Sequence, residues 1–223
     1  FRGELAGLLE DDLQVELIAR GRLAGGSPEV KLEVFKADGR LRGLPFSLDA
    51  QGAYGKEAAA IDRFILVSGA ARLQAHGTIG KSADISWKIN SEDLASLHPD
   101  AKGRVNGKGR LTGPARRPRC QVDLHAKVVA FVDYQAASLD LAADVDLSGE
   151  DNSSISLDLQ GGMAPGVEIR KLDLEGHGGP DEHAFMLVAD TRQGMADLEI
   201  RGKLQRRKDL RAVTRAALGL RQA

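Results

Sequence analysis

The sequence predicts an all-β fold, built as an elongated, meandering antiparallel sheet. Three observations lead to this prediction. Apolar and polar residues alternate along many short segments. Turn signals rich in Gly, Asp and Asn separate these segments. The connections are also too short for the crossovers that parallel strands require.

The alternation is clearest where Leu, Val and Ile occupy every second position. It begins in residues 13–17 (LQVEL) and recurs at 122–126, 155–159, 172–176 and 197–204. Because successive side chains of a strand point to opposite faces, each segment is expected to be a half-buried strand. We expect about twelve to fourteen strands, which at ~4.8 Å per strand make one sheet ~60 Å long.

The turn signals lie at residues 25–28, 37–39, 149–152, 178–181 and 193–194. Each spans only a few residues, which suits hairpins between neighbouring antiparallel strands. A parallel crossover takes a dozen or more residues. A meander, in which each strand pairs with the next, is therefore expected.

Two segments are expected to be helical. Residues 91–98 predict a short helical turn, capped by Asn90 or Ser91 and ended by Pro99. Residues 206–223 predict a basic amphipathic helix, because apolar residues recur there at helical spacing. These apolar residues are Leu210, Val213, Ala217 and Leu220. The expected organisation is thus one continuous sheet module over 1–205, with 206–223 as an end cap.

Composition argues against several classes of protein. Aromatic residues make up only 4% of the chain, and 31 Lys and Arg balance 32 Asp and Glu. A nucleic-acid-binding protein needs a surplus of positive charge, so no nucleic-acid partner is expected. Cys120 is the single cysteine, which excludes an intrachain disulfide. It begins an alternating apolar segment, which favours a buried small hydrophobe over a reactive thiol.

No catalytic, metal or cofactor site is expected. Residues 176–183 (GHGGPDEH) contain metal-binding residue types, but they crowd a Gly-Pro turn, which favours a solvated hairpin loop. Asp140, Asp144 and Asp146 could suggest paired catalytic carboxylates, yet they occupy the polar positions of an alternating strand. Neither a phosphate-binding loop nor a G-x-S-x-G elbow occurs in the sequence.

An ordered set of Gly and Leu motifs covers the centre of the chain. Residues 93–103 (DLASLHPDAKG) lead into 104–113 (RVNGKGRLTG) and then Pro118. Residues 172–176 (LDLEG) are followed by 183–189 (HAFMLVA). This succession resembles the TamB family of translocation and assembly proteins, most strongly over residues 39–204.

The resemblance implies a fold, a location and partners. TamB-like proteins are anchored in the inner membrane by an N-terminal helix, span the periplasm and engage TamA, an outer-membrane β-barrel. Their sheet curls into a taco-like groove with an apolar interior. They are related to AsmA-like and bridge-type lipid-transfer proteins. The membrane anchor is expected to lie outside this chain.

Periodicity alone leaves two ways to hide a continuous aliphatic face: a closed sandwich, or an open groove filled by lipid chains. The resemblance favours the groove. The residues expected to line it are Val122, Leu124, Ala126, Leu139, Leu141, Ala143, Val145, Ile155, Leu157, Leu159, Leu172 and Leu174.

The leading hypothesis is a non-enzymatic periplasmic segment that shields phospholipid acyl chains between the two membranes. The alternative is a chaperone-like scaffold, on which strands of outer-membrane proteins pair with a sheet edge. A carbohydrate-active enzyme is the third hypothesis. It needs aromatic platforms, and Tyr54, Trp87 and Tyr134 are too few and too scattered to supply them.

Overall fold

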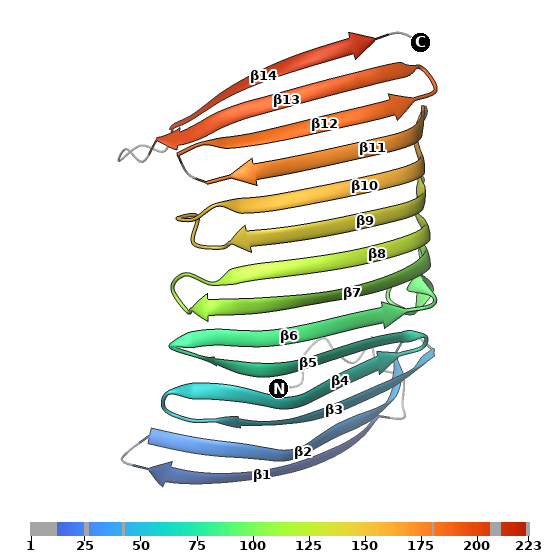
Figure 1. Cartoon of the computed structure of the whole chain (residues 1–223). Helices are drawn as coiled ribbons and strands as arrows, with labels where there is room; N and C mark the ends of the chain where they lie inside the picture. Colours follow the sequence, from blue (N-terminus) through green and yellow to red (C-terminus); the bar gives the residue numbers. More distant parts are fainter. Residues whose placement is uncertain (1–12, 25–26, 42, 180, 206–210, 222–223) are drawn as a thin grey trace.

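The chain forms one open, curved antiparallel sheet of 14 strands, and each strand pairs with the next one in sequence (Figure 1). The computed structural model describes residues 13–24, 27–41, 43–179, 181–205 and 211–221. The predicted meander is confirmed. Helical structure within the described residues is limited to one short 3-10 turn, η1.

The strands are β1 (Gln14–Ala24), β2 (Ser27–Leu41), β3 (Leu44–Tyr54), β4 (Ala58–Ser68), β5 (Ala71–Gly80), β6 (Ser82–Ser91), β7 (Ala101–Pro114), β8 (Arg119–Phe131), β9 (Tyr134–Asp146), β10 (Ser153–Ala164), β11 (Val167–Gly178), β12 (His183–Thr191), β13 (Gly194–Gln205) and β14 (Arg211–Arg221). They range from 9 residues in β12 to 15 in β2. Strands of globular proteins usually have about 5–6 residues, so this sheet is unusually wide as well as long.

The sheet has one layer over the described residues, and its core is correspondingly thin. Buried hydrophobic residues are mostly alanines: Ala37, Ala71, Ala83, Val105, Ala126 and Ala136. The largest fully buried side chain is that of Ser91. No helix among these residues is long and apolar enough to cross a membrane.

The expected turn at residues 37–39 is wrong. These residues lie inside β2, where Asp38 pairs with Ser47 and Gly39 with Phe46. The hairpin instead turns after Leu41, where Leu41 pairs with Leu44. Pairing along the full length of β3 outweighs the local turn preference of an Asp-Gly pair.

The short turn near 91–98 is confirmed as η1 (Leu94–Ser96), between β6 and β7. Its N-cap is Asp93, whose carboxylate accepts a hydrogen bond from the Ala95 amide at 3.0 Å. The expected caps, Asn90 and Ser91, are therefore wrong. Ser91 ends β6 and donates its hydroxyl to the Asp93 carbonyl oxygen at 2.7 Å, so it braces the cap.

The expected helix near the C-terminus is wrong where the structure describes it. Arg211–Arg221 is strand β14, paired along its length with β13. The same sequence also carries a period-two pattern, since Leu218 and Leu220 occupy alternate positions and pair with Leu198 and Ala196. The open edge of β13 offers a ladder of hydrogen bonds that outweighs the helical spacing. Residues 206–210 and 222–223 lie outside the described residues, and the end-cap role of this segment stays a prediction.

Register shifts curve the sheet. The register shifts once in each of these strand pairs: β1–β2, β2–β3, β3–β4, β4–β5, β7–β8 and β11–β12. Each bulge bends its strand and increases the local twist. One of them lies at Gly103 (φ 108°), where a Cβ atom would lie 2.4 Å from the Val128 carbonyl oxygen.

The β8–β9 hairpin contains a strained residue that a substitution should relieve. Phe131 pairs with Tyr134, which leaves a two-residue loop in which Val132 has φ 53° and is 63% exposed. A positive φ at the first loop residue favours Gly and disfavours a β-branched side chain. We expect Val132→Gly to raise the free energy of unfolding by about 1 kcal/mol in urea denaturation. Val132→Ala keeps the Cβ atom and should give less; a loss of stability in the Gly variant would contradict the strain.

Candidate functional site

A continuous apolar row crosses the sheet and defines its apolar face. Directly paired positions place one residue of each strand in line, from β1 to β13. The members are Val15, Ala37, Leu48, Leu66, Leu73, Ile89, Gly107, Leu124, Leu141, Leu157, Leu174, Leu187 and Leu198. Since directly paired residues of neighbouring strands project to the same side, this central row belongs to one face.

All twelve residues expected to line a groove lie on the apolar face. Leu124, Leu141, Leu157 and Leu174 belong to the central row. Beside it run Val122, Ala143 and Ile155 on one flank, and Ala126, Leu139, Leu159 and Leu172 on the other. Val145 lies in the next row outward from Ala143 and pairs directly with Cys120. Each of the twelve is buried or half-buried, and their role in holding an apolar chain stays a prediction.

The sequence prediction missed the extent of this face. It named lining residues only on β8–β11, whereas the central row continues through Leu48, Leu66 and Leu73 on one side and Leu187 and Leu198 on the other. Bulges in β3 and β4 interrupt the period-two pattern there, which obscured it. In successive hairpins, Leu recurs at positions that pair directly with one another. This recurrence is the feature of the sequence that could have revealed the full extent of the face.

Two aromatic rings rest on glycines in the row beside the central one. An added Cβ at Gly109 would lie 2.4 Å from the Trp87 ring atoms Cε2 and Cζ2. An added Cβ at Gly176 would lie 2.5 Å from ring atoms of Phe185 and 2.9 Å from Ile155 Cγ2. The missing side chains thus let bulky rings lie down on the sheet.

Cys120 lies on the apolar face, half-buried between Leu111 and Val145 in the pairing of β7, β8 and β9. Its neighbours are aliphatic. The surroundings agree with the prediction of a small hydrophobic residue.

Charged side chains cover the opposite side, the polar face, which carries Asp123, Asp140, Asp158 and Asp173. His125 links two strands there: its Nδ1 hydrogen-bonds to Asp140, and its Nε2 lies 2.9 Å from Asp123 Oδ1. The hydrogen bond to Asp140 and the charge of both carboxylates raise the pKa of His125. On the polar face, interactions between charged side chains of neighbouring strands therefore help to hold the strands together.

The three aspartates of β9 have structural roles. Asp140 pairs with His125, and Asp144 accepts hydrogen bonds from Gln121 and Arg119, which lower the pKa of the Asp144 carboxyl. Asp146 is only 6% exposed and anchors the β9–β10 turn. Its carboxylate accepts hydrogen bonds from the Asp151 and Glu150 amides, both at 2.7 Å, and from the Ser148 hydroxyl at 2.8 Å.

The histidines of residues 176–183 lie at the ends of β11 and β12 rather than in the loop between them. His183 pairs with Gly178, and its ring packs edge-on against Phe185 with centroids 6.2 Å apart. His177 pairs with Ala184 and is exposed. Over the described part of the chain, no group of three His, Cys, Asp or Glu residues is arranged to hold a metal ion.

Together, these features define a class: a single-layer, open β-sheet with one continuous apolar face. A family model described as the N-terminal domain of TamB matches residues 4–213. The chain belongs to the TamB family and is a segment of a TamB-like cell-envelope protein.

A curated relative supports the same assignment. The translocation and assembly module subunit TamB of Haemophilus influenzae is 23% identical over 206 residues, which cover 87% of this chain. The aligned segment spans 15% of that protein. No solved structure matches the chain significantly.

The anchoring role of Asp146 predicts a pH-dependent loss of stability in Asp146→Asn. Hydrogen bonds from the Asp151 amide, Ser148 and the Glu150 amide hold the pKa of Asp146 well below its ordinary value. A lowered pKa contributes stability that is present above the ordinary pKa of about 3.9 and is lost as pH falls. We expect the variant to have a lower Tm at pH 7, with a difference that shrinks below about pH 4. A Tm difference that is the same at pH 7 and pH 3 would contradict this account.

The contact between Gly109 and Trp87 predicts a second effect. Gly109→Ala brings a Cβ into the indole and to 2.6 Å from the Gln121 carbonyl oxygen. We expect the free energy of unfolding to fall by about 1–3 kcal/mol, and the emission of Trp87, the only tryptophan, to shift. Gly21→Ala is the matched control, because its nearest neighbour would be 3.6 Å away. Equal losses in both variants would point to a general effect of filling strand glycines.

Proposed function

We propose that the apolar face shelters the acyl chains of phospholipids on their way between the inner and outer membranes. One observation carries the proposal: the central row is apolar across thirteen successive strands, and no second layer among the described residues covers it. A face of this kind gains stability when apolar chains lie on it, at ~0.8 kcal/mol per buried CH₂ group.

The character of the face supports this choice. The residues of its central row are aliphatic or glycine. A hydrocarbon chain lying there would leave few polar atoms buried without a hydrogen-bond partner. The rings of Trp87 and Phe185 lie over glycines of the neighbouring strands, Gly109 and Gly176. Binding of this kind needs no specific contact, and the proposed role involves no chemical step.

The proposal also covers location and partners. The segment lies in the periplasm as part of a protein anchored in the inner membrane, and other parts of that protein engage a TamA-like β-barrel in the outer membrane. The length of the sheet, ~60 Å at ~4.8 Å per strand, suits a segment that bridges a gap.

A second candidate function rests on the edge of the sheet. β1 pairs only with β2 among the described strands, so the other side of its backbone is available for β-augmentation by an extended chain. On this alternative, the segment is a scaffold for outer-membrane strands. Crosslinks from probes on β1, rather than on the central row, would favour it.

Aspartates on the apolar face should separate lipid binding from folding. We expect Leu141→Asp with Leu157→Asp, a directly paired couple of the central row, to abolish co-purifying phospholipid in native mass spectrometry, because two charges would have to be desolvated. The matched control is Ala142→Asp with Ser156→Asp, a directly paired couple on the polar face of the same strands.

The control pair should keep its lipid, and both proteins should keep their β-sheet circular dichroism. Wild-type levels of phospholipid in the Leu141→Asp, Leu157→Asp variant would overturn the assignment of the apolar face. A wild-type protein without lipid that also takes up no lipid probe would move the scaffold function to first place.

A further inference from the structure

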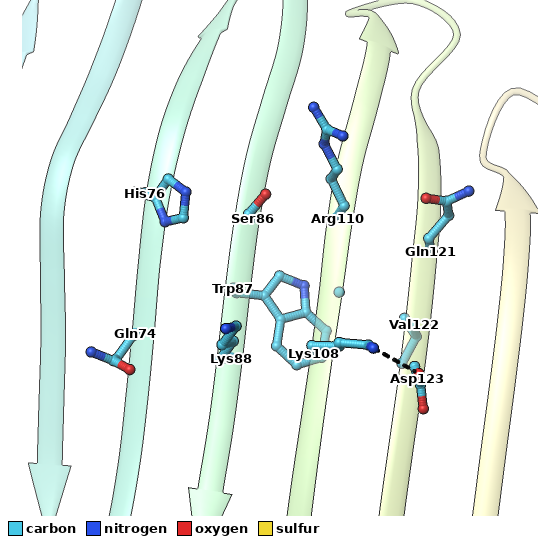
Figure 2. Close-up of a pocket in the computed structure, with 11 residues that line it drawn as sticks. Gln74, His76, Ser86, Trp87, Lys88, Lys108, Arg110, Gln121, Val122 and Asp123 are labelled. Atoms are coloured by element: carbon cyan, nitrogen blue, oxygen red, sulfur yellow. Dashed lines mark ion pairs between the residues drawn. The ribbon is translucent and has the colours of Figure 1, made fainter.

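A cleft of about 580 Å³ lies on the polar face, over β5, β6, β7 and β8 (Figure 2). Its volume is within the range of sites for small molecules. Two rows of polar side chains form its walls. Trp87, Gly109 and Val122, which pair directly with one another, also line it between these rows. It is on the side of the sheet opposite the central row, so it is separate from the proposed lipid site.

The register of the strands determines which residues share each wall of the cleft. One wall contains Lys88 and Lys108, which are directly paired across β6 and β7. The other contains Arg110, directly paired with Ser86. Directly paired side chains have Cβ atoms about 5 Å apart, so Lys88 and Lys108 lie close together. Like charges at such positions oppose pairing of the strands, so a bound anion would relieve this repulsion.

The cations of the cleft are only partly neutralised. Lys108 Nζ lies 3.3 Å from Asp123 Oδ2, and Arg110 donates to both oxygens of Asp84 at 3.0 Å (Figure 2 shows the Lys108–Asp123 pair). Asp84 thereby takes two of the five N–H donors of the guanidinium. For Lys88, no carboxylate within the described part of the chain comes to ion-pair distance.

The surrounding charge has the same sign. Over residues 71–131, Lys and Arg outnumber Asp and Glu more than twofold, whereas over 132–202 the acids outnumber the bases more than threefold. The cleft therefore lies in a basic stretch of the chain, β5–β8, which an acidic stretch, β9–β13, follows along the sheet. An anion would be attracted to the basic stretch.

The geometry points to this cleft as a binding site for a phosphate ester. Lysine ammonium groups bind phosphate as point charges, and the free guanidinium N–H groups and the Gln74 amide add donors. A volume of about 580 Å³ exceeds that of inorganic phosphate and suits a phosphate carried on a glycerol or sugar. Such an ester could be a soluble metabolite or the headgroup of a phospholipid, because both present the same chemistry.

Titration with glycerol 1-phosphate, followed by NMR or calorimetry, tests the site. We expect Lys88→Gln with Lys108→Gln to weaken binding about tenfold or more, because two charge-assisted contacts are lost. The control is Arg104→Gln with Lys127→Gln, a directly paired basic couple on β7 and β8 that does not line the cleft. The control should bind within about twofold of wild type, and Lys88→Arg with Lys108→Arg should retain binding, which reports charge rather than shape.

Vesicles identify the source of the ester. The protein is floated with phosphatidylglycerol vesicles, and phosphatidylcholine vesicles serve as the comparison. Flotation with phosphatidylglycerol alone that is lost in the Lys88→Gln, Lys108→Gln variant would assign a lipid headgroup. Binding of glycerol 1-phosphate without flotation would assign a soluble ester. Equal weakening in both double Gln variants, or no binding of glycerol 1-phosphate to the wild type, would overturn the site. Neither result depends on lipid occupancy of the apolar face, which the Leu141 and Leu157 variants report separately.

Discussion

The backbone ladder between successive strands is the interaction on which the rest of this structure depends. The described residues form one layer with few buried side chains, so among them no packed core holds the strands in place. Each strand between β1 and β14 is held by its two neighbours. The strand register therefore fixes the positions that core packing fixes in a β-sandwich. A slip of one residue would turn every Leu of a strand from the apolar face to the polar face. Short hairpins limit such slips, because they tie each strand to the next in sequence.

On the apolar face, register decides shape as well as polarity. The central row is mostly Leu, interrupted by Ala37 and Gly107, whereas the row beside it alternates large and small residues, such as Phe64 against Ala75 and Trp87 against Gly109. Each bulky ring then lies against a small partner, so a single layer gains some interdigitation. Bulges in several strands bend the sheet while the rows remain aligned across it.

On the polar face, ion pairs between neighbouring strands add modest support. Examples are Arg63 with Asp49 at 3.0 Å and Lys171 with Asp158 at 3.4 Å. Each exposed pair contributes about 0–1 kcal/mol. Direct like-charge pairs also occur in the native register: Lys88 with Lys108, Arg104 with Lys127, and Asp158 with both Asp140 and Asp173. Repulsion at these places offsets part of the support from the ion pairs.

The sequence by itself determined the fold class, the meander and the face on which each of the twelve residues from Val122 to Leu174 lies. Period-two alternation is local and needs no knowledge of neighbouring strands. Only the tertiary structure decided that Asp38 and Gly39 continue a strand, that Arg211–Arg221 pairs with β13, and that Lys88 lies beside Lys108. These outcomes depend on which residues meet across a ladder. That pairing is set by the length and bulges of neighbouring strands, which no single segment encodes.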